Sequence, residues 1–157
     1  MFSIAALLVA AFVFFQSKDK KSDEEQAAGI SRPLQLQAYE RLVLLCERMA
    51  LPHLISRLSQ PGMSAREMQV FLIETIKQEF EYNATQQIYV SALAWDAVRN
   101  LRDQNMLLIN SISKTLPQDA TAVDLNKQIM QSLLSEERAA LHTHATEVLS
   151  VEAKKIM

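Results

Sequence analysis

Residues 1–15 read MFSIAALLVAAFVFF, and this stretch divides the chain into two parts of opposite character. It carries no charge, and Ser3 is its one polar residue. The sequence QSKDKK follows directly and reverses that character. We therefore predict a membrane anchor helix over residues 1–15, a charged tether over 16–32 and an α-helical domain over 33–157.

The anchor is short, which leaves three interpretations open. Fifteen residues make about 22 Å of helix, whereas the hydrocarbon layer is roughly 30 Å thick. The native start lies upstream of Met1, or the helix spans a thinned bilayer with residues 16–18 at the interface. In the third interpretation, residues 1–15 are the signal peptide of an exported protein. That signal peptide lacks a basic start, and it ends on the bulky Phe14 and Phe15.

Orientation follows from the lysines that flank the apolar stretch. Lys18, Lys20 and Lys21 come just after it, and no basic side chain precedes it. The positive-inside rule then predicts a single-pass protein of the cell inner membrane with its C-terminal domain in the cytoplasm. The single cysteine, Cys46, excludes an intrachain disulfide and fits a reducing compartment. It lies on an apolar helix face, which indicates a buried core thiol rather than a nucleophile.

The composition predicts an all-α domain. The 157 residues include only 2 glycines and 4 prolines, whereas sheets with tight turns need more glycine. Leu, Ala, Gln, Glu and Met dominate, and these residues favour helices. We expect a bundle of four to five helices. The formal charge of −2 and the scattered cations give no reason to expect a nucleic-acid partner.

Helical spacing defines the first half of this domain. A first helix is expected from about Pro33, with an interruption at residues 51–52 and a short turn or helix over 53–58. Its apolar face comprises Tyr39, Leu42, Val43, Cys46, Met49 and Ala50. The sequence SARE at residues 64–67 is a capping box that starts a second helix, running to about Phe80. The residues expected inward on it are Met68, Phe71, Leu72, Thr75, Ile76 and Phe80.

Helical spacing also defines the C-terminal half of this domain. A helix over residues 92–115 is expected to end before Pro117, and Asn105 in its apolar stripe is either a satisfied core amide or a specificity device. Thr121 or Asp119 caps the next helix, and a new start at residues 135–137 divides 121–157 into two helices. The faces expected inward on these two are Leu125, Ile129, Met130, Leu133 and Leu134, then Leu141, Ala145, Val148, Leu149 and Ile156.

The stretch EFEYNATQQIYVSALAW at residues 79–95 is the most distinctive in this domain. A break at residues 83–85 is predicted, with residues 88–90 either extended or forming a crossing segment, and with Ser91 capping the next helix. One continuous helix is the alternative. Its aromatic residues Tyr82, Tyr89 and Trp95 either pack in the core or form an interaction surface. These three residues are the candidate interaction surface.

At this point the chain resembles a known family. Its order is an apolar start, a charged tether, AYERLVLLCERM, then EFEYNATQQIYVSALAW and a C-terminal helical pair. It is similar to an uncharacterised, Bacteroidota-type bacterial family of single-pass, membrane-anchored helical proteins, a domain of unknown function. The resemblance implies an anchored α-helical domain and brings no catalytic or ligand-binding residues. The short apolar segment departs from the family pattern.

No catalytic, metal-binding or cofactor-binding residue is predicted. His142 and His144 point about 200° apart on a helix and cannot share a metal, and His53 stands alone. Acid–base work by the carboxylates near the aromatic stretch would need a cleft that perturbs their pKa. These carboxylates are Glu79, Glu81 and Asp96.

Three functional hypotheses result, and one of them is the exported protein, described above, whose signal peptide is residues 1–15. The first is a non-enzymatic interaction or scaffold domain, tethered to the membrane through residues 1–15, that binds an unidentified protein partner on the cytoplasmic side. The alternative is a ligand-binding or enzymatic domain with a cleft near residues 79–96.

Overall fold

The computed structural model describes the backbone of residues 31–157 and the side chains of residues 31–135 and 140–157. All regular elements in this part of the chain are helical, which confirms the predicted all-α fold. Six α-helices occur here, more than the four to five expected, because residues 51–58 form a separate helix after the interruption at residue 50. A first helix occupies residues 31–49 and therefore already includes two residues ahead of the start expected near Pro33. The elements after it are α2 (Leu51–Leu58), α3 (Ala65–Tyr82), the short 3-10 helix η1 (Ala84–Ile88), α4 (Ala92–Thr115), α5 (Ala122–Leu133) and α6 (Glu136–Ile156).

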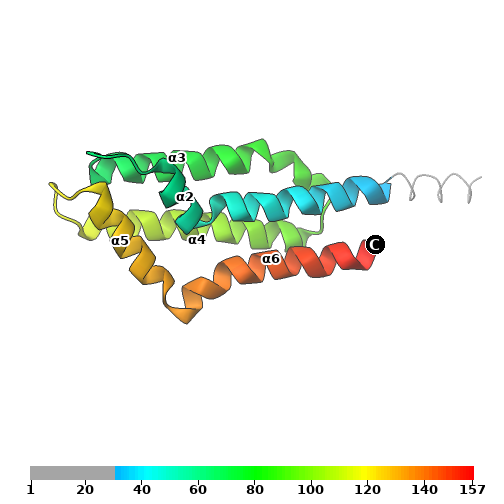
Figure 1. Ribbon diagram of the computed structural model, residues 1–157. Coiled ribbons are helices and arrows are strands. Elements are labelled where there is room, and N and C mark those ends of the chain that lie inside the picture. Colours follow the sequence, from blue (N-terminus) through cyan, green and yellow to red (C-terminus); the bar gives the residue numbers. More distant parts are fainter. Residues whose placement is uncertain (1–30) are drawn as a thin grey trace, which may run out of the picture.

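The helices form a bundle around α4. Figure 1 shows the first helix, α3, α4 and α6 along one long axis, with α5 oblique at one end. Helix α4 contacts α3, α5 and α6, and α3 also contacts α2 and α5. The largest fully buried side chains come from every α-helix: Leu42, Leu45, Met49, Leu51, Leu54, Met68, Leu72, Ile76, Ile109, Leu125, Ile129 and Leu149.

Two capping boxes fix the end of the bundle where α5 begins. The Ser64 hydroxyl accepts from the Glu67 amide at 3.2 Å, and the Glu67 carboxylate accepts from the Ser64 amide at 2.9 Å. Thr121 and Asp124 form the same box at the start of α5. The two starts are joined by backbone bonds, since Ala65 N–H donates to the Ala120 carbonyl at 2.9 Å. The caps predicted at residues 64 and 121 are thus confirmed.

The backbone carbonyl groups at the end of the first helix accept hydrogen bonds, although the helix is interrupted there. The Asn105 Nδ2 donates to the Met49 carbonyl at 2.9 Å, so Asn105 is a satisfied core amide. The Glu47 carbonyl accepts from the Ala50 amide at 3.2 Å. The same carbonyl lies 3.1 Å from Nδ1 of His53. Because a carbonyl only accepts, Nδ1 of His53 carries the proton.

The break predicted after α3 is confirmed, but the extended conformation predicted for residues 88–90 is wrong. Ile88 ends η1, and Tyr89 continues in an αR conformation with its amide donating to the Gln86 carbonyl at 3.0 Å. The reason is that no neighbouring strand is present among residues 31–157 to pair with an extended segment, so local i to i+3 bonds satisfy the backbone. Ser91 caps α4 as predicted, by accepting from the Ala94 amide at 3.1 Å.

Three residues expected inward are exposed: Phe71, Met130 and Leu134. On α3 the buried face includes Gln69 in place of Phe71. Nε2 of Gln69 donates a hydrogen bond to Oδ1 of Asn110 at 2.8 Å, and the Ser113 hydroxyl donates to Oε1 of Gln69 at 2.8 Å. Asn110 and Ser113 are both on α4. Leu134 lies past the end of α5, in the turn that precedes α6. The split between α5 and α6 is as predicted, although the Ser135 hydroxyl donates to the Ser132 carbonyl and does not cap α6.

Tyr39 joins three helices at the opposite end of the bundle. Its hydroxyl accepts from the Ser91 amide at 3.2 Å and donates to Oε2 of Glu152 at 3.5 Å. The middle of the first helix is therefore joined to the residue before α4 and to the last turns of α6. Figure 1 shows that the N-terminal end of the first helix and the C-terminal end of α6 point to this end of the bundle. We call this the tether end, because residue 31 lies beside it.

No helix within residues 31–157 combines the length and the hydropathy needed to cross a bilayer. The predicted anchor, residues 1–15, lies outside the described residues.

Candidate functional site

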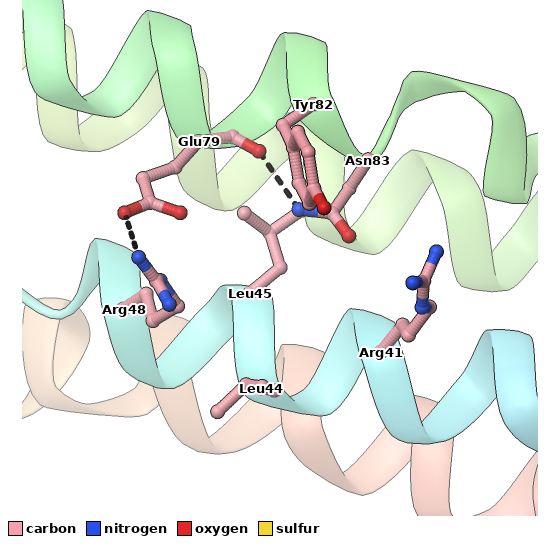
Figure 2. A pocket seen from close by; sticks show the side chains of 7 residues that line it. All are labelled: Arg41, Leu44, Leu45, Arg48, Glu79, Tyr82 and Asn83. Atoms are coloured by element: carbon pink, nitrogen blue, oxygen red, sulfur yellow. Dashed lines mark hydrogen bonds and ion pairs between the residues drawn. The ribbon is translucent and has the colours of Figure 1, made fainter.

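The candidate site is a groove of about 400 Å³ between the first helix and α3 (Figure 2). We call it the Arg41–Tyr82 groove. Its lining residues are Arg41, Leu44, Leu45, Arg48, Glu79, Tyr82 and Asn83. The first helix and α3 lie side by side, and their side chains form the two walls of the groove (Figure 2).

A partly buried carboxylate organises one side of the groove. Oε1 of Glu79 lies 2.7 Å from Nη2 of Arg48 and 3.6 Å from Nη2 of Arg57, and the Glu79 side chain is 13% exposed. The hydrogen bond and the charge of Glu79 raise the pKa of Arg48. The Asn83 amide is committed as well, since Nδ2 donates to the Glu79 carbonyl at 2.9 Å. These contacts hold that side of the groove in one arrangement.

The other side of the groove is open for binding. Arg41 has no ion-pair partner among the described side chains, those of residues 31–135 and 140–157, and Figure 2 shows it at the opposite end of the groove from Arg48. Tyr82 lies between the two arginines and is 77% exposed, and Leu44 is also exposed. An exposed aromatic ring, an exposed aliphatic side chain and an unpaired guanidinium together favour binding to an acidic segment that also carries apolar side chains.

Of the three aromatic residues predicted as an interaction surface, only Tyr82 lines the groove. Tyr89 is partly exposed in the turn at the tether end. Trp95 packs on the core, with its ring centroid 5.0 Å from that of Phe80. Sequence reasoning missed Arg41 and Leu44. For Arg41 the sequence did hold a signal, since its i, i+7 spacing from Arg48 places both guanidinium groups on one helix face.

A second cavity, of about 280 Å³, lies among the first helix, α2, α4, α5 and α6. It is lined by Glu47, Ala50, Leu51, Pro52, His53, Leu101, Asn105, Leu133 and His142. Sequence spacing did not predict that His53 and His142 meet at one carboxylate. Nε2 of His142 lies 3.3 Å from Oε1 of Glu47, and Nδ1 of His53 lies 3.9 Å from Oε2. Nε2 of His142 is buried and makes no directed hydrogen bond within the described part of the chain.

The histidines of the second cavity have different surroundings. Nδ1 of His53 is already bound to the Glu47 carbonyl at 3.1 Å. No group of three or more histidine, cysteine, aspartate or glutamate side chains with metal-binding geometry occurs in the described residues.

Cys46 is the buried core thiol that the sequence predicted. Burial, assisted by the negative charge of Glu47, raises its pKa to about 12. A thiol in this state is a poor nucleophile.

The fold and the groove define an all-α helical domain with a groove of about 400 Å³ between its first helix and α3. The chain belongs to DUF7935, a family of unknown function whose model matches residues 1–156. The expected resemblance to a family of unknown function is thereby confirmed. No curated protein and no solved structure matched the chain.

Proposed function

We propose that the protein is a membrane-tethered, non-enzymatic interaction domain that binds an acidic segment of a protein partner in the Arg41–Tyr82 groove. The observation that carries this proposal is the position of Tyr82 and Leu44, both exposed, beside the Arg41 guanidinium group, which has no ion-pair partner among the described side chains. Tyrosine and arginine are typical anchors of protein interfaces.

Charge supports an acidic partner. The groove lining carries Arg41 and Arg48 against the single carboxylate of Glu79, which leaves one positive charge in excess. Since Glu79 is occupied by Arg48 at 2.7 Å, an incoming carboxylate would pair with Arg41 and could do so in a bidentate manner. The neighbouring Tyr82 ring and Leu44 would contact apolar side chains of the same segment.

The tether supports the same function. In this proposal residues 1–15 anchor the chain in the cell inner membrane, and Lys18, Lys20 and Lys21 keep the helical domain on the cytoplasmic side. Anchoring raises the effective concentration of the groove near any partner in the same membrane. A modest affinity is then sufficient for occupancy.

The alternative, a ligand-binding or enzymatic cleft near residues 79–96, has one supporting observation. Glu79, Tyr82 and Asn83 line the groove at the start of that range. However, the Glu79 carboxylate is paired with two arginines and the Asn83 amide bonds a backbone carbonyl. The polar groups that a substrate would need are therefore already engaged.

Photo-crosslinking in native membranes tests the interaction proposal. With a benzophenone side chain in place of Leu44, we expect one discrete crosslinked species on the full-length chain. Arg41→Glu should weaken that crosslink about tenfold or more, because it replaces an attractive charge contact by a repulsive one. Arg99→Glu, on an exposed arginine of α4 outside the groove, is the control and should leave the crosslink unchanged.

The same probe at Val123 is the positional control, since this exposed side chain lies at the far end of the bundle. Equal crosslinking at residues 44 and 123, or a crosslink at residue 44 that survives Arg41→Glu, would contradict the proposal.

A further inference from the structure

The carboxylate of Glu47 lines the second cavity and receives no directed hydrogen bond from a described side chain. Nε2 of His142 lies 3.3 Å from Oε1 of Glu47 but makes no directed hydrogen bond to it. Nδ1 of His53 lies 3.9 Å from Oε2 and donates to the Glu47 backbone carbonyl at 3.1 Å instead. Because the Glu47 side chain is 45% exposed, an incoming donor can reach it.

Two other polar side chains of the second cavity offer acceptors as well. Since Nδ1 of His53 carries its proton, Nε2 of the neutral ring is an acceptor. The Asn105 Nδ2 is committed to the Met49 carbonyl at 2.9 Å, which leaves the amide oxygen of Asn105 as an acceptor. Such a lining favours a ligand that donates several hydrogen bonds, and a primary ammonium group has three donors.

The charge at the second cavity also favours a cation. Glu47 is the one lining residue that is an aspartate, glutamate, lysine or arginine. The described cations within four residues of the lining already pair with carboxylates: Arg48 and Arg57 with Glu79, Arg99 with Asp96, and Arg102 with Asp103. Residues 136–139 at the start of α6 read EERA, and their one acid in excess balances the one cation in excess around Glu79. The negative charge of Glu47 is therefore not cancelled by its neighbours.

Apolar side chains form the rest of the second cavity. Leu51 and Leu101 are each 2% exposed, and Ala50, Pro52 and Leu133 complete the apolar lining. The volume is about 280 Å³, whereas an apolar cavity of about 150 Å³ accommodates benzene. There is room for one ring with a short chain. An apolar lining with a few polar groups is the usual composition of a small-molecule site.

We propose that the second cavity binds a small primary amine with an apolar body. The ammonium group pairs with the Glu47 carboxylate and donates its remaining hydrogens to acceptors of the lining. The body of the ligand lies against Leu51 and Leu101. This site is separate from the Arg41–Tyr82 groove, since no residue lines both. It depends neither on the groove nor on the anchor.

Titration calorimetry of the full-length chain with 2-phenylethylamine tests this site. At pH 8 an alkylamine is protonated. We expect saturable binding at one site with a dissociation constant of about 1 mM, which is within the range for a ligand of this size. The uncharged 2-phenylethanol, with the same ring and chain, should bind about tenfold more weakly. Phenylacetate carries the opposite charge and should not bind measurably.

Two glutamate variants locate the charge contact. Glu47→Gln should weaken binding of the amine about tenfold and leave binding of the alcohol nearly unchanged. Glu40→Gln is the matched control, since Glu40 is exposed on the same helix about two turns earlier. It should leave both affinities unchanged.

Ala50→Leu locates the apolar body, because it adds three carbon atoms to the lining of the second cavity. This variant should lose binding of both the amine and the alcohol. Circular dichroism verifies that each variant is folded. The two glutamate variants decide the charge contact independently of Ala50→Leu.

Three results would overturn the proposal. The first is equal affinity for the amine and the alcohol, or an equal loss of amine binding in Glu47→Gln and Glu40→Gln. The second is undiminished amine binding in folded Ala50→Leu, which would place the ligand elsewhere. The third is no saturable heat up to about 10 mM amine at two temperatures, since burial of apolar surface makes the binding heat depend on temperature.

Discussion

Asn105→Ala is expected to lower the free energy of unfolding by about 1–3 kcal/mol, because it leaves a buried carbonyl without its hydrogen-bond donor. The Asn105 Nδ2 donates to the Met49 carbonyl at 2.9 Å, at the end of the first helix. Asn105 is 8% exposed, so water does not replace the lost donor efficiently. Urea unfolding followed by circular dichroism measures the loss.

Asn100→Ala is the matched control for this effect. Asn100 lies on the same helix as Asn105 but is exposed. Both variants gain the same helix propensity from alanine, so the propensity term cancels in the comparison. The control should change stability by no more than about 0.5 kcal/mol. Equal unfolding midpoints for the two variants would show that the hydrogen bond from Asn105 to the Met49 carbonyl does not stabilise the interruption after the first helix.

The thiol of Cys46 should react with Ellman's reagent about a thousand times more slowly in the folded protein than in the unfolded protein, from its ionisation alone. The reason is that the pKa rises from 9.0 to about 12 on folding, a difference of three units. Burial of the sulfur slows the reaction further. Labelling rates near pH 8, with and without urea, measure the ratio, and comparable rates in both states would contradict the buried position.

The same thiol makes stability depend on pH in the alkaline range. Its folded pKa lies above the unfolded value, so between about pH 9 and pH 12 the unfolded chain has lost a proton that the folded chain retains. The free energy of unfolding therefore falls as pH rises through this window. In Cys46→Ala the free energy of unfolding should fall less steeply with pH between about pH 9 and pH 12 than it does in the parent chain.

Local signals in the sequence predicted the helix boundaries well. Ser64 and Thr121 start helices through capping boxes, and Pro117 follows the end of α4. Ser91 also caps as expected. These signals succeed because each depends on a few consecutive residues whose hydrogen bonds form within one turn.

Features that depend on tertiary packing were less predictable. Phe71 fits an apolar stripe by spacing, yet Gln69 takes the buried position because Asn110 and Ser113 on α4 satisfy its amide. Residues 88–90 favour strands by composition, but Ile88 ends η1 and no strand is available to pair with them among the described residues. In both cases the neighbouring element decides, and spacing along one helix does not reveal it.

The groove illustrates the same limit for function. Tyr82 was a candidate from the sequence, but Arg41 and Glu79 join it only through the packing of the first helix against α3 (Figure 2). The meeting of His53 and His142 at Glu47 likewise joins three helices. Residues far apart in the chain carry no sequence signal for such contacts.

Membrane retention of the full-length chain is the decisive measurement for the proposed anchor. We expect the chain to remain in the membrane fraction after alkaline carbonate extraction, with residues 1–15 still present by N-terminal sequencing. A chain that lacks residues 2–15 should leave that fraction. Release of the full-length chain by carbonate, or a mature N-terminus beyond Phe15, would contradict a retained membrane anchor.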